Sequence, residues 1–181
     1  MTRPLPIMRT HLHQMLRSEA GNPTVEFALL FPIFLSLFLA TFEIGMVMIH
    51  QVNLDRAVDL TVRDLRLGNI EDPDQDKLRQ NICGNTSMIK DCMTSLLIEL
   101  RPVDQTTWDT LPDEVTCRER EADIDPVVSL DPGSSHEMML VRVCAVFDPW
   151  FPTTRIGMSL HRDELGGYAI VATSAFVNEP S

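Results

Sequence analysis

The sequence lacks the short motifs that mark the common catalytic sites. It contains no nucleophile elbow, no phosphate-cradling glycine loop and no pair of histidines at metal-ligand spacing. Residue types that occur in active sites are present at 134–136 (Ser-Ser-His) and at 161–164 (His-Arg-Asp-Glu), and we interpret both as polar loop residues. We therefore expect no catalytic residues and no cofactor.

The chain also lacks the positive charge that binds nucleic acid. Its formal net charge is −11, and most of this charge is concentrated after residue 50, where 23 acidic residues outnumber 12 basic ones. An acidic domain repels phosphates, so we expect no nucleic-acid partner. The segment before residue 22 differs, because Arg3, Arg9 and Arg17 outweigh Glu19. The two parts of the chain are thus suited to different surroundings.

Between these parts, residues 24–49 are almost free of charge. Only Glu26 and Glu43 interrupt the apolar run, and the 16 uncharged residues 27–42 span about 24 Å as a helix. The run on to Ile49 covers a hydrocarbon core of about 30 Å. A buried core helix of a soluble protein is the alternative. We favour a membrane-spanning helix, because apolar residues occupy every face and a basic segment precedes it.

The basic leader also predicts the orientation of this helix. Lys and Arg stay cytoplasmic, so we expect a single-pass protein of a bacterial inner membrane, with everything after His50 in the periplasm. A cleaved secretory signal is not expected, because the apolar run is too long and no small-x-small site follows it.

The helical pattern continues beyond the membrane. Apolar residues at 54, 58, 62 and 65 form one stripe, which predicts a continuous helix over 24–67 that ends at Gly68. The stripe could pack on the periplasmic domain or on a partner helix. We divide the chain into a basic cytoplasmic leader (1–21), a transmembrane helix (22–50), an amphipathic periplasmic extension (51–67) and a periplasmic α+β domain (68–181).

The periplasmic domain is expected to contain a short helix followed by strands. The helix should open at 72–74 (Asp-Pro-Asp) and run to Ile82. Strands are predicted at 95–101, 138–147 and 169–176, with Glu99 and Arg142 alternating with apolar residues as in a half-buried antiparallel sheet. The stretch 102–133 has nine acidic residues and no lysine, and we expect it to be a solvated loop. The fold class is therefore α+β, a long spine helix packed on a small antiparallel sheet.

The four cysteines all lie on the periplasmic side of the predicted membrane helix. An even number in an oxidising compartment indicates two disulfides, and four cysteines allow three pairings. We favour Cys83–Cys92 as a local clamp and Cys117–Cys144 as a tie between the acidic loop and a central strand. A loop of about ten residues contributes about 3 kcal/mol of stability. A zinc site is the alternative, although no Cys-x-x-Cys pair is present and the histidines lie elsewhere.

Two features of the N-terminal third resemble a known family. Gly21 followed by Glu26 resembles a type IV prepilin site, where cleavage between Gly21 and Asn22 would make Glu26 the fifth residue of the mature chain. More narrowly, residues 25–32 (Val-Glu-Phe-Ala-Leu-Leu-Phe-Pro) and 42–45 (Phe-Glu-Ile-Gly) resemble the TadE-like pseudopilins of tight adherence (Tad) pilus assembly.

The resemblance extends to the C-terminal end and also has departures. Residues 168–176, with the tail 178–180, are similar to the family's last strand, whereas 68–135 carry no resemblance. Residues 19–20 (Glu-Ala) stand where the family has a basic residue before the glycine, and Ile44 replaces an aromatic residue.

The resemblance implies a membrane-held subunit of Tad/Flp-type adhesive pilus assembly, with an extracellular location in the filament as the alternative. Its partners would be other pilins or pseudopilins, the Tad inner-membrane platform, prepilin peptidase and inner-membrane lipid. Glu26, with Phe27 beside it, would serve assembly by pairing with the new α-amine of a neighbouring subunit. The alternative for Glu26 is a headgroup position that complements the helix dipole.

Glu43 lies about 25 Å further along the helix, near the expected outer interface. It could extend into the periplasm or contact another membrane component in assembly. Two other functions stay open for the whole chain. One is a membrane-anchored periplasmic ligand-binding or enzymatic domain, and the other is an uncleaved scaffold subunit of a secretion complex.

Overall fold

The fold is taken from a computed structural model of the chain. It describes residues 23–104, 106, 117–118, 126, 128–151 and 167–179. The leader with Gly21, Asn22 and most of the predicted acidic loop lie outside the described residues. The chain divides into two compact units, residues 1–39 and 40–181. The second unit contains all the described strands.

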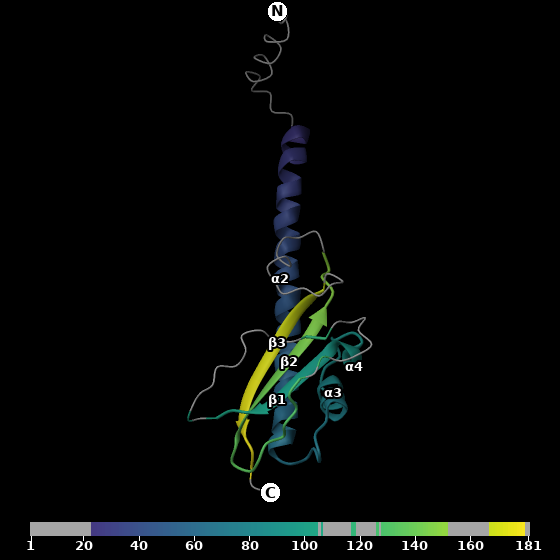
Figure 1. The fold of residues 1–181 in the computed structure, drawn as a ribbon. Coiled ribbons are helices and arrows are strands. Elements are labelled where there is room, and N and C mark those ends of the chain that lie inside the picture. Colours follow the sequence, from purple (N-terminus) through teal and green to yellow (C-terminus); the bar gives the residue numbers. More distant parts are fainter. Residues whose placement is uncertain are drawn as a thin grey trace, which may run out of the picture. The chain divides into compact units, whose positions relative to one another are not determined.

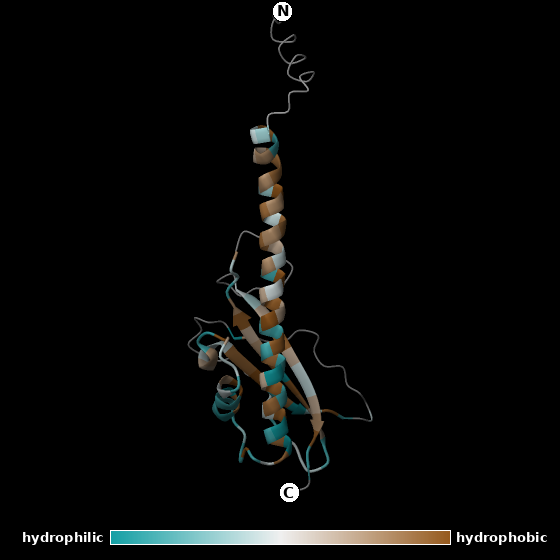
Figure 2. Ribbon diagram, turned by 180° about the vertical axis from the view of Figure 1, so that it is seen from behind, coloured by the Kyte–Doolittle hydropathy of each residue, from teal (hydrophilic) through white to brown (hydrophobic). Residues whose placement is uncertain are grey.

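Helix α2 (Pro23–Arg66) confirms the predicted long helix and continues through Pro32. Its early turns are mostly apolar, and hydrophilic residues become more frequent toward its C-terminal end (Figure 2). The helix ends as expected at Gly68, which has a φ of +70°. The Gly68 amide donates to the Leu65 carbonyl and the Asn69 amide to the Asp64 carbonyl, both at 3.0 Å. This is a Schellman cap, in which glycine occupies the left-handed position most cheaply.

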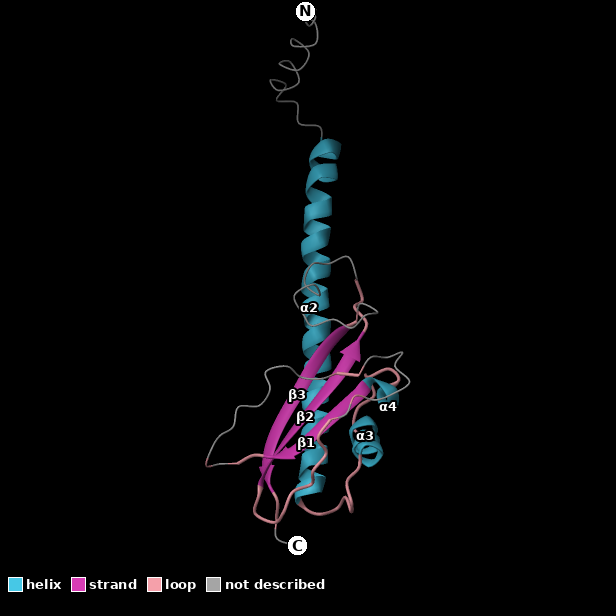
Figure 3. Ribbon diagram, viewed as in Figure 1, coloured by secondary structure: helices cyan, strands magenta, loops and turns pink. Residues whose placement is uncertain are grey.

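Three antiparallel strands form one sheet in the order β1–β2–β3 (Figures 1 and 3). They are β1 (Leu96–Pro102), β2 (Met138–Phe147) and β3 (Tyr168–Val177), each within a residue or so of the predicted bounds. Glu99 lies directly opposite Arg142, and their side chains form an ion pair at 2.7 Å. The α+β class is therefore confirmed.

The predicted half-buried character of the sheet is wrong for β2. Every residue from Met139 to Phe147 is buried, including Arg142. The reason is its position: β2 is the central strand, one face of which packs against α2 residues such as Leu54 and Val58. The other face carries Cys144, which is linked to Cys117. The apolar stripe of α2 therefore faces its own domain.

Two short helices precede β1. Helix α3 (Gln75–Gly84) begins and ends two or three residues later than expected, because Asp74 is its N-cap and accepts from the Lys77 amide at 2.7 Å. Helix α4 (Cys92–Ser95) is a single turn that the sequence did not predict. Both helices lie beside β1 in Figure 1.

Part of the predicted solvated loop is in fact paired with the sheet. Leu130 forms a parallel bridge with Leu100 of β1. The Leu100 amide donates to the Ser129 carbonyl at 2.9 Å, and the Asp131 amide donates to the Leu100 carbonyl at 2.8 Å. Residues 129–131 therefore cover the outer edge of β1 at this point, a long-range contact without a local sequence signal.

Candidate functional site

The N-terminal part of α2 presents apolar side chains outward. Helix α2 is long and apolar enough to cross a membrane, and only 6 % of its most apolar window is buried within the chain. The alternative of a buried core helix is therefore not supported. Glu26 lies exposed in the first turn, and Phe27 stacks on Phe31 with ring centroids 5.0 Å apart. Both residues are thus on an accessible surface, and their role in assembly stays a prediction.

Glu43 is placed quite differently from Glu26. Its side chain is 1 % exposed although it lies only one residue after the uncharged run. Its carboxylate accepts two backbone hydrogen bonds, from the Trp150 amide at 3.2 Å and from the Phe151 amide at 3.0 Å. The sequence suggested water or another membrane component as its partner. The structure instead gives this carboxylate two partners in its own chain, and a contact with other subunits stays a prediction.

The same loop makes aromatic contacts with the residue before Glu43. The ring of Phe42 meets Trp150 edge-on at 6.5 Å and Phe151 edge-on at 5.9 Å between centroids. Such edge-to-face arrangements are favourable because ring edges are positive and ring faces negative. One turn of α2 therefore holds the loop that follows β2 through two hydrogen bonds and two ring contacts.

A second cluster lies under this loop. His50, one heptad after Glu43 on α2, lies 4.2 Å from the ring of Phe147, which in turn stacks on Tyr168 at 6.1 Å. Within the described part of the chain, the Tyr168 hydroxyl and His50 Nδ1 are buried without a hydrogen-bond partner. Burial, with the nearby charges of Glu43 and Asp148, raises the pKa of Tyr168 to about 12. The sequence gave no signal for this cluster, because its members come from three separate elements.

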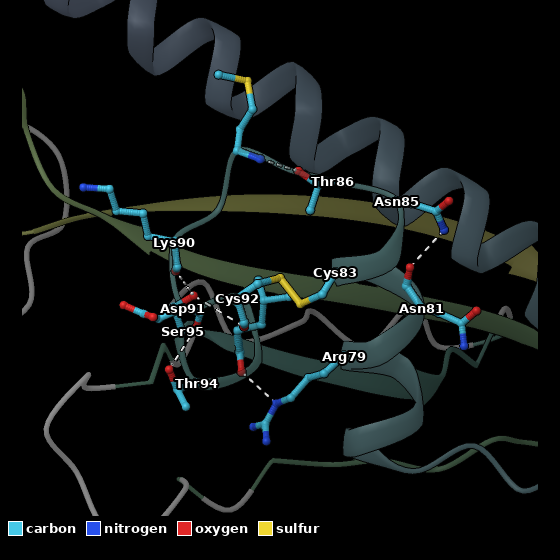
Figure 4. The surroundings of a disulfide bond; sticks show 12 residues. Arg79, Asn81, Cys83, Asn85, Thr86, Lys90, Asp91, Cys92, Thr94 and Ser95 are labelled. Carbon is cyan, nitrogen blue, oxygen red and sulfur yellow. Dashed lines mark hydrogen bonds between the residues drawn. A yellow bond between two sulfur atoms is a disulfide. The ribbon is translucent and has the colours of Figure 1, made fainter.

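Both disulfides are present in the favoured pairing. Cys83 near the end of α3 is bonded to Cys92 at the start of α4, with Cα atoms 5.8 Å apart (Figure 4). Cys117 is bonded to Cys144 in the central strand, with a Cα separation of 5.3 Å. Arg79 Nε donates to the Leu96 carbonyl at 3.0 Å, so α3 is attached to α4 by the disulfide and to β1 by this hydrogen bond. The cysteines therefore have a structural role.

A surface depression lies where α2 ends and α3 begins. It has a volume of about 560 Å³ and polar walls, with Lys77 as its basic residue. The Lys77 ammonium already donates to the Glu71 carbonyl at 2.7 Å and the Asp72 carbonyl at 3.0 Å. Within the residues that the structure describes, no group of three or more His, Cys, Asp or Glu side chains could hold a metal.

Comparison with known proteins identifies the family of one part of the chain. Residues 24–63 match the family model described as TadE-like protein. The matched segment contains Glu26, Phe27 and Glu43, and it confirms the resemblance for that part of the chain. The match suggests involvement in Tad pilus assembly. No curated protein and no solved structure matches the chain.

Proposed function

Because residues 24–63 match the TadE-like family, we propose that the chain is a pseudopilin-like membrane protein of Tad/Flp-type pilus assembly. It is held in the inner membrane by α2, with the N-terminus cytoplasmic and the domain in the periplasm. Prepilin peptidase cuts it between Gly21 and Asn22, and it then contacts other pilins or pseudopilins and the Tad platform. The observation that carries the proposal is the family match over a helix whose apolar side chains are exposed.

The position of Glu26 supports the cleavage step. Cutting after Gly21 would leave Asn22 as the new N-terminus, directly before the helix that begins at Pro23. The new α-ammonium and Glu26 would then lie within about one turn of each other along the helix axis. A carboxylate in an apolar environment is costly unless it is paired. Pairing Glu26 with the ammonium of a neighbouring subunit would therefore fix the register between adjacent helices.

The proposal assigns no catalytic activity to the chain. The matched segment belongs to a family of pilus-associated structural proteins. In the polar depression, the Lys77 ammonium is already hydrogen-bonded to two backbone carbonyls. A tethered enzyme or binding domain would need convergent polar groups in a cavity. An uncleaved scaffold subunit would share the membrane helix and would differ by keeping its leader.

Processing is tested by the intact mass of the protein purified from membranes, with and without co-expressed prepilin peptidase. We expect the wild-type chain to lose residues 1–21 only when the peptidase is present, and Gly21→Ala to abolish this loss. Gly45→Ala is the matched control, because Gly45 lies inside α2, away from the cleavage site, and a Cβ there meets nothing within 4 Å. Persistence of the full chain beside a peptidase that cleaves a known prepilin would reject the pseudopilin mechanism and favour an uncleaved scaffold.

A further inference from the structure

The loop after β2 carries an exposed aromatic surface that the proposed function does not use. Trp150 is 60 % exposed, and Phe42 of α2, against which its ring lies, is 44 % exposed. Phe151 completes the group through its contact with Phe42. We call Phe42, Trp150 and Phe151 the aromatic platform. A tryptophan this exposed on a water-facing surface leaves a large apolar area in contact with solvent, which is unusual unless something covers it.

The aromatic platform is attached to the helix by Glu43. Burying an ionised carboxylate is costly unless hydrogen bonds compensate it, and both oxygens of Glu43 are occupied by backbone amides of the platform itself. Hydrogen bonds to a charged group are stronger than neutral ones. The depth of Trp150 along α2 is therefore set by the position of Glu43 in the sequence.

That depth coincides with the end of the uncharged run. Phe42 is the last of the 16 uncharged residues, and Trp150 contacts it directly. From its first residue, Pro23, to Phe42 the helix rises by about 29 Å, close to the thickness of the hydrocarbon core, so a helix that enters the core at Pro23 reaches its far side at about Phe42. Tryptophan is enriched at such membrane–water boundaries, where its apolar ring and its N–H group are both accommodated. Solvent exposure, aromatic character and position on the helix therefore all fit a lipid headgroup layer.

We propose that the aromatic platform is an interfacial anchor that lies in the headgroup region of the outer leaflet, with Glu43 as its positioning residue. The inference rests on the membrane anchoring in the proposed function and adds a second, domain-borne contact with the bilayer. The domain is then attached to the membrane at two points, the N-terminal part of α2 and the residues Trp150 and Phe151 after β2. Extraction of the subunit from the membrane requires the platform to leave the interface together with the helix.

The test uses the full chain in phosphatidylcholine vesicles that contain brominated lipids, which quench tryptophan at a known depth. Trp108→Phe leaves Trp150 as the one tryptophan, since the sequence has two. We expect lipids brominated near the carbonyl end of the acyl chain to quench Trp150 roughly twofold more than lipids brominated near the methyl end, as for a residue at the interface. Glu43→Gln loses one acceptor and should reduce this difference, whereas Glu26→Gln, the other carboxylate of the apolar run, should not.

The outcomes separate the anchor from the proposed function. Extraction of the chain from the vesicles by alkaline carbonate would reject the membrane helix and, with it, both proposals. A chain that resists carbonate but shows no quenching by either lipid would overturn the anchor alone, since Trp150 would then face water or protein. Stronger quenching by the methyl-end bromines would place Trp150 in the hydrocarbon core and would also overturn it. The Trp108→Phe measurement decides the anchor even if Glu43→Gln fails to fold.

Discussion

Tyr168 gives the sharpest test of the buried cluster that it forms with Phe147 and His50. Its side chain is 1 % exposed, and its hydroxyl is buried without a hydrogen-bond partner among the described residues. Burial raises the pKa of Tyr168 from 10.0 to about 12, with smaller contributions from Glu43 and Asp148. The folded state therefore holds the phenolic proton more tightly than the unfolded state. The resulting stabilisation is complete below pH 10 and is lost as the pH rises through about 12.

The magnitude follows from the size of the shift. Two pKa units correspond to roughly 3 kcal/mol of stability lost across this pH window, a large part of the stability of a small domain. Tyr168→Phe removes the ionisable group and the unpaired hydroxyl together. We expect the variant to be about 1 kcal/mol more stable than wild type at pH 8, because an unsatisfied buried hydroxyl is destabilising. Its stability should also not show the additional decrease between pH 10 and 12 that the ionisation of Tyr168 causes in wild type.

The assay benefits from the composition of the chain. Tyr168 is the one tyrosine in the sequence, so phenolate absorbance titrates this residue alone. Urea unfolding in detergent micelles at pH 8, 10 and 11 gives the stability of both proteins, and the variant accounts for every other alkaline effect. A phenolate that titrates near pH 10 in the folded protein, or a variant that loses as much stability as wild type, would refute the reasoning.

Three further stability changes are expected, each measured by urea unfolding of the full chain. Replacing Cys83 and Cys92 together by serine should cost about 3 kcal/mol, since the disulfide joins two residues nine positions apart. Reducing agent should lower the stability of wild type more than that of the variant, because the variant has only the Cys117–Cys144 bond to lose. Gly68→Ala should cost about 1 kcal/mol, because alanine is strained at the left-handed φ of the helix cap, whereas Gly45→Ala should be neutral or stabilising. Asp74→Ala should cost about 1 kcal/mol and Asp74→Asn much less, because asparagine keeps an acceptor for the Lys77 amide; equal losses would contradict a capping role.

The long helix and the strands were predictable because their signals are local. An apolar run of membrane length, an apolar stripe ending at Gly68 and three β-rich runs each depend on neighbouring residues only. The number of cysteines predicted two disulfides, and of the three possible pairings the favoured one is present. The predicted start of α3 was a few residues too early, because aspartates at both 72 and 74 are suited to cap a helix. The side chain of Asp74 is the one that accepts from the Lys77 amide.

The surroundings of Glu43 were not predictable for a physical reason. Its two donors lie 107 and 108 residues away, and they are backbone amides, which carry no signal in residue type. The burial of the Cys144 face of β2 and the pairing of residues 129–131 were missed for the same reason, since both depend on segments that are distant in sequence. An acidic stretch predicts solvent exposure from its composition alone. A single backbone pairing at Leu130 is enough to attach part of it to the sheet.

The outer edge of β1 is largely closed to pairing with a strand of another copy of the chain. Three of its successive outward carbonyls are already occupied: Leu96 by Arg79, Ile98 by Gln75 and Leu100 by the amide of Asp131. Pro102, at the end of the strand, has no amide to offer. An unpaired strand edge recruits strands from other copies of a chain, and this hazard grows when many copies are confined to one membrane surface. Side chains of α3 and one loop therefore close this edge to strand-to-strand aggregation.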